Sequence, residues 1–119
     1  MHLFAQILIA FVALLHLYFL ALEMFFWDKP LGRKAFNLTP EFAAASKKLA
    51  ANQGLYNGFL AAGLIWSLAL GGHEGLHVAI FFLTCVIVAG IYGALTVNKR
   101  IFFFQAMPAI VTLIMLHAR

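Results

Sequence analysis

Charged side chains are scarce in this chain: they make up 10% of its 119 residues, and only four residues are acidic. Soluble domains are about one quarter charged and about half apolar, whereas 65% of this sequence is hydrophobic. A water-soluble fold of this length could not hide so much apolar surface, so the composition excludes an ordinary soluble domain and favours lipid as the solvent. The length allows one domain, residues 1–119, and we see no linker between two cores.

Cysteine is almost absent as well. The single Cys85 excludes an intramolecular disulfide and any cysteine-based metal site, and we interpret it as a small buried hydrophobe. The net charge of +4 does not indicate a nucleic-acid partner, because the basic residues gather in two short segments between apolar runs. We therefore expect no nucleic-acid partner.

One motif raises the question of a metal. The residues His73-Glu74-Gly75-Leu76-His77 match the H-E-x-x-H pattern of zinc proteases. No Asp or Glu follows Glu74 to act as a third ligand, and Gly75 weakens the helix that the motif requires. We expect no metal site and no cofactor.

Four hydrophobic runs fill most of the chain, at about 3–27, 50–70, 76–97 and 101–117. Each is close to the roughly 20 residues that a membrane-spanning helix needs. We predict an all-α polytopic membrane protein, an antiparallel bundle of four transmembrane helices with a cytoplasmic loop at about 28–49. Within that loop, Thr39-Pro40-Glu41 has the residues of a helix start, and the helix from Pro40 could continue into the second span.

The basic residues predict the orientation of the bundle. The two segments on one face of a four-span bundle carry seven of the eight basic residues, with Arg119 alone opposite. Cytoplasmic loops are enriched in Lys and Arg, so both termini should lie outside and the protein should be a multi-pass protein of a bacterial inner membrane. The seven residues are Lys29, Arg33, Lys34, Lys47, Lys48, Lys99 and Arg100.

Polar residues recur inside all four runs at a similar depth. Glu23 should lie about 6 Å inside the cytoplasmic boundary, at about 1.5 Å per residue, with His16 deeper. Residues 52–57 of the second span share the depth of Glu23, and we assign Gly54, Gly58 and Ala62 to the opposite side of that helix as a close-packing face. The candidate ligand-binding residues are His16, Glu23, Asn52, Gln53, Tyr56, Asn57, Tyr92, Thr96 and Gln105.

Three functions fit this polar set. An ionisable residue inside a span is expensive and indicates a functional site, so the leading hypothesis is a pocket, open to the cytoplasm, that binds or transports a small polar or cationic ligand. In it Glu23 supplies charge and His16 a proton or a hydrogen bond. The second hypothesis is a membrane enzyme acting on a lipophilic substrate, with Glu23 or His16 as general base. The third is a structural or partner-binding subunit, whose polar network merely holds the helices together.

Three segments carry a resemblance to a known family: His16–Trp27, Asn52–Phe59 and Gly90–Thr96. They resemble a family of small bacterial four-span inner-membrane proteins known only as a domain of unknown function. The resemblance covers nearly the whole chain and implies a bacterial inner-membrane protein, but it implies no activity.

Two weaker likenesses concern the assembly. Small multidrug transporters are also four-span chains of this size, with a Glu in the first helix, and two copies make a pathway. The four-span membrane proteins of eicosanoid and glutathione metabolism form trimers. By these analogies of fold we expect a homo-oligomer, a dimer or a trimer, in the lipid bilayer.

Overall fold

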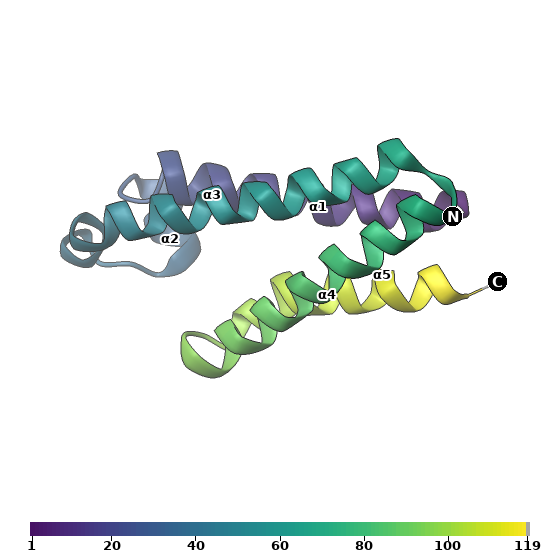
Figure 1. Cartoon of the computed structure of the whole chain (residues 1–119). Coiled ribbons are helices and arrows are strands. Elements are labelled where there is room, and N and C mark those ends of the chain that lie inside the picture. The colour runs from purple at the N-terminus through teal and green to yellow at the C-terminus, as the bar shows by residue number, and fades with distance from the viewer. Residues whose placement is uncertain (119) are drawn as a thin grey trace. The chain divides into compact units, whose positions relative to one another are not determined.

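The computed structural model describes residues 1–118, and Arg119, the basic residue expected on the outer face, lies outside the described residues. Residues 1–118 contain helices and no strand, which confirms the all-α prediction. In chain order the elements are α1 (Leu3–Phe25), α2 (Pro30–Phe36), α3 (Pro40–Leu70), α4 (Gly72–Thr96), a π-helical turn η1 (Phe102–Ala106) and α5 (Met107–His117) (Figure 1).

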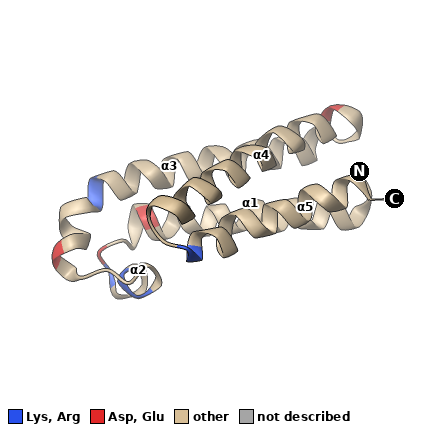
Figure 2. Ribbon diagram, turned by 90° about the horizontal axis from the view of Figure 1, so that it is seen from below, with Lys and Arg blue, Asp and Glu red and all other residues tan. Residues whose placement is uncertain are grey.

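Two helices, α1 and α4, are long and apolar enough to cross a membrane, with 23 and 25 residues. Their most apolar stretches are only 28% and 22% buried, so most of their apolar side chains are wholly or partly exposed. Large exposed apolar surfaces are typical of contact with lipid or with another protein. The ribbons of α4 and α5 are almost free of charged positions along their length (Figure 2). A third, shorter apolar helical stretch runs over Phe102–His117.

The start of α3 follows the chemistry of its first residues. Thr39 Oγ1 accepts a hydrogen bond from the Phe42 amide at 3.2 Å, and Pro40 occupies the first helical position, where its missing N–H leaves no bond unmade. From Pro40 the helix runs for 31 residues to Leu70. The segment 28–49, which we expected to connect two spans as a loop, is therefore mostly helical and also contains α2.

The chain forms two compact units, and the first comprises residues 14–61. Here the C-terminal half of α1 packs antiparallel against the first half of α3. A Cβ added to Gly54 would lie 2.7 Å from Met24 Cγ, and one added to Gly58 would lie 2.7 Å from Leu20 Cδ1. Because a side chain at either position would collide with α1, the two glycines bring the helices close together.

The second unit comprises residues 1–13 and 62–118, with close packing of its own. The end of α3 packs on the start of α4, where a Cβ on Gly75 would lie 2.4 Å from the Ser67 carbonyl oxygen. One residue, Gly71, joins these two helices, and its φ of +64° is a conformation that other residues rarely adopt. At the other end of α4, a Cβ on Gly90 would lie 2.7 Å from the Ala106 nitrogen of η1. Our single-domain interpretation of the whole chain stays a prediction.

The turn η1 has a cause in the sequence. Pro108 follows it and has no amide hydrogen, so the carbonyl that a regular helix would pair with it, in the turn around Phe104, loses its donor. The Met107 amide bonds instead to the carbonyl of Phe102, five residues back. Such π-helical turns are rare and are often found at functional sites.

Candidate functional site

Glu23 is the only acidic residue among the buried polar side chains of the described residues, with 2% of its surface exposed. Both of its carboxylate oxygens accept hydrogen bonds from α3. Gln53 Nε2 donates to Oε2 at 2.6 Å, and Asn57 Nδ2 donates to Oε1 at 2.5 Å. Gln53 and Asn57 are four residues apart and so share one face of α3. We call Glu23, Gln53 and Asn57 the carboxylate clamp.

The glycines of α3 make this clamp possible. A Cβ on Gly54 would lie 3.1 Å from Glu23 Cβ and 3.2 Å from the Leu20 carbonyl oxygen, so α3 touches α1 beside the carboxylate. The close helix packing expected at Gly54 and Gly58 is confirmed, but their assignment to a side of α3 opposite Gln53 and Asn57 is wrong. At about 100° per residue, the arc that faces α1 holds Gln53 and Asn57 together with the two glycines.

The remaining polar residues of this segment turn away from the clamp. Asn52 is exposed, and Tyr56 has 59% of its surface exposed, with its ring packed edge-on to Phe59 at 5.8 Å. On the helix, Asn52 lies about 100° from Gln53 and Tyr56 lies about 100° from Asn57. The wide polar face that the sequence indicates thus holds two pairs. Gln53 and Asn57 bind Glu23, with Asn57 buried and Gln53 largely exposed, and Asn52 and Tyr56 form the exposed second pair.

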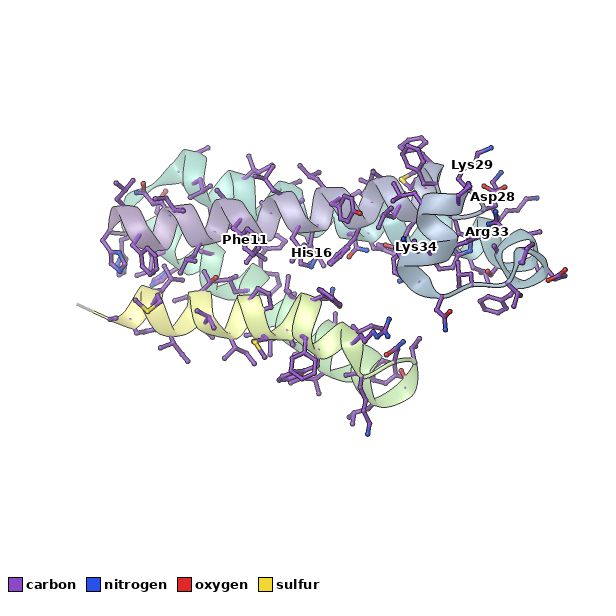
Figure 3. The ribbon with its side chains drawn as sticks, turned by 180° about the vertical axis from the view of Figure 1, so that it is seen from behind. Phe11, His16, Asp28, Lys29, Arg33 and Lys34 are labelled. Carbon is purple, nitrogen blue, oxygen red and sulfur yellow. The ribbon has the colours of Figure 1, made fainter. Side chains whose placement is uncertain are left out.

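His16 lies on α1 about two helical turns before Glu23, and its side chain is fully buried (Figure 3). Its ring packs edge-on against Phe19, with the ring centroids 5.3 Å apart. A buried imidazole is a good proton carrier or hydrogen-bonding group. His16 and the clamp belong to the same compact unit, residues 14–61.

The other three candidate residues belong to the second compact unit. Tyr92 is exposed at 69%, and the Thr96 hydroxyl donates to the Tyr92 carbonyl oxygen at 2.7 Å, within its own helix. Gln105 lies in the π-helical turn η1 and is half-buried. Because the hydroxyl of Thr96 already has a partner on its own backbone, it is less available to a ligand than its position in the sequence suggests.

The clamp has a notable electrostatic property. Within residues 1–118 the one ion pair joins Lys47 to Asp28, so no Lys, Arg or His side chain neutralises Glu23. Buried charges in proteins are usually paired with an opposite charge or bound to a metal. Two neutral amide donors hold the Glu23 carboxylate instead, and the arrangement can accept a proton or a cation as its counter-charge.

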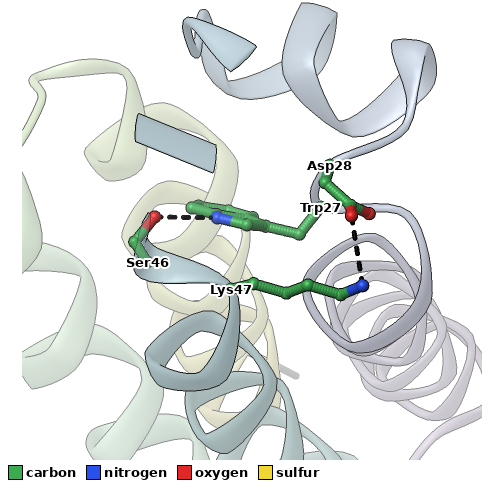
Figure 4. A network of polar contacts seen from close by, with 4 residues as sticks. All are labelled: Trp27, Asp28, Ser46 and Lys47. Carbon is green, nitrogen blue, oxygen red and sulfur yellow. Dashed lines mark hydrogen bonds and ion pairs between the residues drawn. The ribbon is translucent and has the colours of Figure 1, made fainter. Parts of the chain in front are cut away.

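Sequence reasoning missed a second polar network at the end of α1 (Figure 4). Trp27 Nε1 donates to Ser46 Oγ at 3.0 Å, and Lys47 Nζ lies 3.1 Å from Asp28 Oδ2. Trp27 is the last residue of the first apolar run, 3–27. Its distance of 19 residues from Ser46 hides the contact in the sequence, and the signal that could have revealed it is the helix start at Pro40, which turns α3 back toward α1.

The zinc-protease pattern lies in the first two turns of α4. The rings of His73 and His77 are close, with centroids 4.3 Å apart. In the part of the chain that the structure describes, no third His, Cys, Asp or Glu joins them in a group that could hold a metal ion. Both imidazoles are exposed at the start of α4.

Comparison with known proteins identifies the family but no activity. The sequence profile of a family described as "Protein of unknown function (DUF1304)" matches residues 10–117. An "Uncharacterized protein YpaA" of Lactococcus lactis subsp. lactis (strain IL1403) is 34% identical over 110 residues, which cover 91% of this chain and 92% of that protein. No solved structure matches the chain. The resemblance seen in the sequence is thereby confirmed, and the chain belongs to the DUF1304 family of proteins of unknown function.

Proposed function

We propose that this protein spans the bacterial inner membrane four times, with both termini outside, and that it binds or transports a small cationic or polar ligand at the carboxylate clamp. Glu23 supplies the negative charge, and Gln53 and Asn57 orient the carboxylate. His16, in the same compact unit, supplies a proton or a hydrogen bond. Asn52 and Tyr56 of the same unit stay proposed ligand-binding residues. So do Tyr92, Thr96 and Gln105, which belong to the other compact unit and are proposed there separately from the clamp.

The observation that carries the proposal is a buried carboxylate with two amide donors and no cationic partner among residues 1–118. Removing such a charge from water costs several kcal/mol unless something compensates for it. Within a membrane the compensation comes from a counter-charge. A cationic ligand, or a proton exchanged for it, fits this requirement.

The proposed four spans rest on helix lengths and on the position of the charges. Helices α1 and α4 have the length and composition of spans, α3 is long enough at 31 residues, and η1 with α5 forms the fourth apolar stretch. The basic residues cluster between the first and second spans and between the third and fourth. By the preference of Lys and Arg for cytoplasmic loops, this arrangement favours termini on the outside.

The test is binding of tetraphenylphosphonium, a monovalent lipophilic cation, to the purified full chain in detergent. We expect wild type to bind the probe and Glu23→Gln to lose at least about tenfold in affinity, because the substitution removes the charge but keeps the shape. The matched control is Glu41→Gln, which removes an exposed carboxylate at the start of α3 and should bind as wild type does.

Native mass spectrometry of the same proteins extracted in their own lipid complements the probe. A small molecule retained by wild type and lost in Glu23→Gln would identify the chemical class of the ligand. Equal binding of the probe to wild type and Glu23→Gln, with no molecule retained by either, would contradict the proposal.

A structural role is the second candidate, and one observation favours it. Both oxygens of Glu23 already have donors from α3, so the clamp joins two helices even without a ligand. If Glu23→Gln lowers the thermal midpoint and leaves binding of the probe unchanged, the role of the clamp is to hold α1 and α3 together.

The exposed polar residues of α3 support a homo-oligomer. Asn52 and Tyr56 face away from α1 and are exposed within an apolar stretch of the chain. A polar side chain is better placed against protein than against lipid. We propose that this face meets a second copy of the chain, and an Asn52→Leu variant that dissociates into monomers in native mass spectrometry would support that contact.

A further inference from the structure

The unit formed by residues 14–61 carries a dense group of basic side chains at the end of α1. We call these residues the basic cluster: Lys29, Arg33, Lys34, Lys47 and Lys48. The acidic residues in the same stretch are Asp28 and Glu41. Asp28 already forms an ion pair with Lys47, with 3.1 Å between Oδ2 and Nζ. Figure 3 shows Lys29, Arg33 and Lys34 together on and beside α2. The cluster therefore has a net positive charge that the described residues do not neutralise.

The helix that carries Arg33 and Lys34 is held firmly in place. Gly32 is buried against the end of α1, where a Cβ would lie 2.0 Å from the Phe26 carbonyl oxygen. The Trp27 ring packs on Phe36 with the centroids 5.0 Å apart, and its nitrogen is fixed by Ser46. The C-terminal end of α2 is closed by a left-handed residue, Asn37, whose amide bonds to the Arg33 carbonyl. These contacts fix the position of α2, and with it the backbone positions of Arg33 and Lys34.

Arg33 has an unused donor at this place. Its Nε is buried and has no hydrogen-bond partner among residues 1–118. A buried donor without an acceptor costs about 1–3 kcal/mol. Arg33 as a whole is only half-buried, so a shift of its side chain toward an acceptor outside the chain would relieve that cost. The guanidinium group presents its N–H groups as a planar fork, which matches the oxygens of a phosphate group.

We propose that the basic cluster binds the phosphate of an anionic phospholipid headgroup, with Arg33 as the main contact and Lys29 and Lys34 beside it. The apolar side chains around the cluster favour a lipid over a soluble phosphate. Phe25, Phe26 and Leu31 are exposed at 63%, 42% and 50% on the same unit. Such a combination of basic and large apolar residues is typical of segments that lie in the membrane interface. The site is separate from the carboxylate clamp and does not depend on its function.

The test is lipid retention by the full chain in neutral detergent, measured by native mass spectrometry with phosphatidylglycerol and phosphatidylcholine of identical acyl chains. We expect wild type to retain phosphatidylglycerol about tenfold more tightly. Arg33→Gln/Lys34→Gln should remove this preference. Arg33→Lys, which keeps the charge but removes the fork, should reduce it. The matched control is Lys99→Gln/Arg100→Gln, which removes the same charge from the connection between α4 and η1 and should retain the preference.

Several results would overturn the site. Equal retention of the two lipids by wild type would do so, and so would equal losses in the two double variants, because a diffuse attraction would then explain the preference. Competition by inorganic phosphate alone, with no retention of lipid, would replace the headgroup with a soluble anion. The pair of buried atoms Arg33 Nε and Asp28 Oδ1 offers a different explanation, an internal ion pair. In that case Arg33→Gln lowers the thermal midpoint while lipid retention stays unchanged.

Discussion

At the scale of single residues, Glu23 shows how a carboxylate can be kept inside an apolar helix without a cation from its own chain. Its two oxygens take one amide donor each, from Gln53 and Asn57. A carboxylate accepts hydrogen bonds and cannot donate them, so both amides must present their NH2 groups to it. The orientation of two α3 side chains is therefore set by the charge state of one α1 side chain.

Glu23→Ala should destabilise the protein. It leaves the amides of Gln53 and Asn57 without their acceptors, and we expect a loss of about 1–3 kcal/mol in the free energy of unfolding. The measurement is the thermal midpoint in detergent. Glu41→Ala, on an exposed residue, is the control and should change the free energy by less than about 0.5 kcal/mol. A wild-type midpoint for Glu23→Ala would mean that the clamp is not formed in solution.

The Lys47–Asp28 pair predicts a small dependence on pH. The hydrogen bond from Lys47 holds the pKa of Asp28 below its ordinary value of 3.8. A lowered pKa stabilises the fold above that value, and the contribution is lost as the pH falls through the folded-state pKa. Lys47→Met should therefore lower the thermal midpoint slightly at pH 7 and not at pH 2. Lys48→Met is the control, and an equal effect of Lys47→Met at both pH values would show that the pair is not formed.

At the scale of helices, the contact between α1 and α3 depends on two glycines. Gly54→Leu would drive a side chain into Met24 and Glu23, whose atoms lie 2.7 and 3.1 Å from the position of a Cβ. Overpacking of this kind costs about 1–3 kcal/mol, and it should also separate Glu23 from its amides. The measurement is the thermal midpoint together with probe binding. Ala62→Leu adds bulk at an exposed position of the same helix and should be tolerated.

Much of this helical structure could be predicted from the sequence. The residues Thr39-Pro40-Glu41 predicted the start of α3, and matching depths along the spans predicted that Glu23 would lie level with Gln53 and Asn57. These signals are local or depend only on helix rise, which is the same in every helix.

Other features could not be predicted for physical reasons. The side of α3 that faces α1 depends on how closely two backbones approach, and hydropathy does not encode that distance, so Gly54 and Gly58 were misassigned. Helix α2 was missed because its seven residues, PLGRKAF, are too few to show a period. The π-helical turn follows from a shift in hydrogen bonding before Pro108, and apolar residues such as Phe102–Phe104 give no sign of it.

At the scale of the whole molecule, the proposed four spans make a prediction about accessibility. In a Cys85→Ser background, single cysteines replace Glu41, Glu74 and Lys99, and a membrane-impermeant maleimide is added to intact cells. With both termini outside, only the Glu74→Cys variant should be labelled, because the first and third connections face the cytoplasm. Labelling of Glu41→Cys and Lys99→Cys instead would reverse the orientation, and labelling of all three would argue against four spans.

The tight contact of Gly32 with Phe26 decides where this chain will accept added sequence. The backbone between Trp27 and Pro30 is fixed by that contact and by the hydrogen bond from Trp27 to Ser46. An epitope or a fluorescent domain inserted there would break the packing of α2 against the end of α1. Asn37 caps α2 and Thr39 caps α3, so the joint between the two finished helices lies between Leu38 and Thr39. Insertions succeed best at such exposed joints, so this joint is the natural attachment point for a reporter that must leave the helices intact.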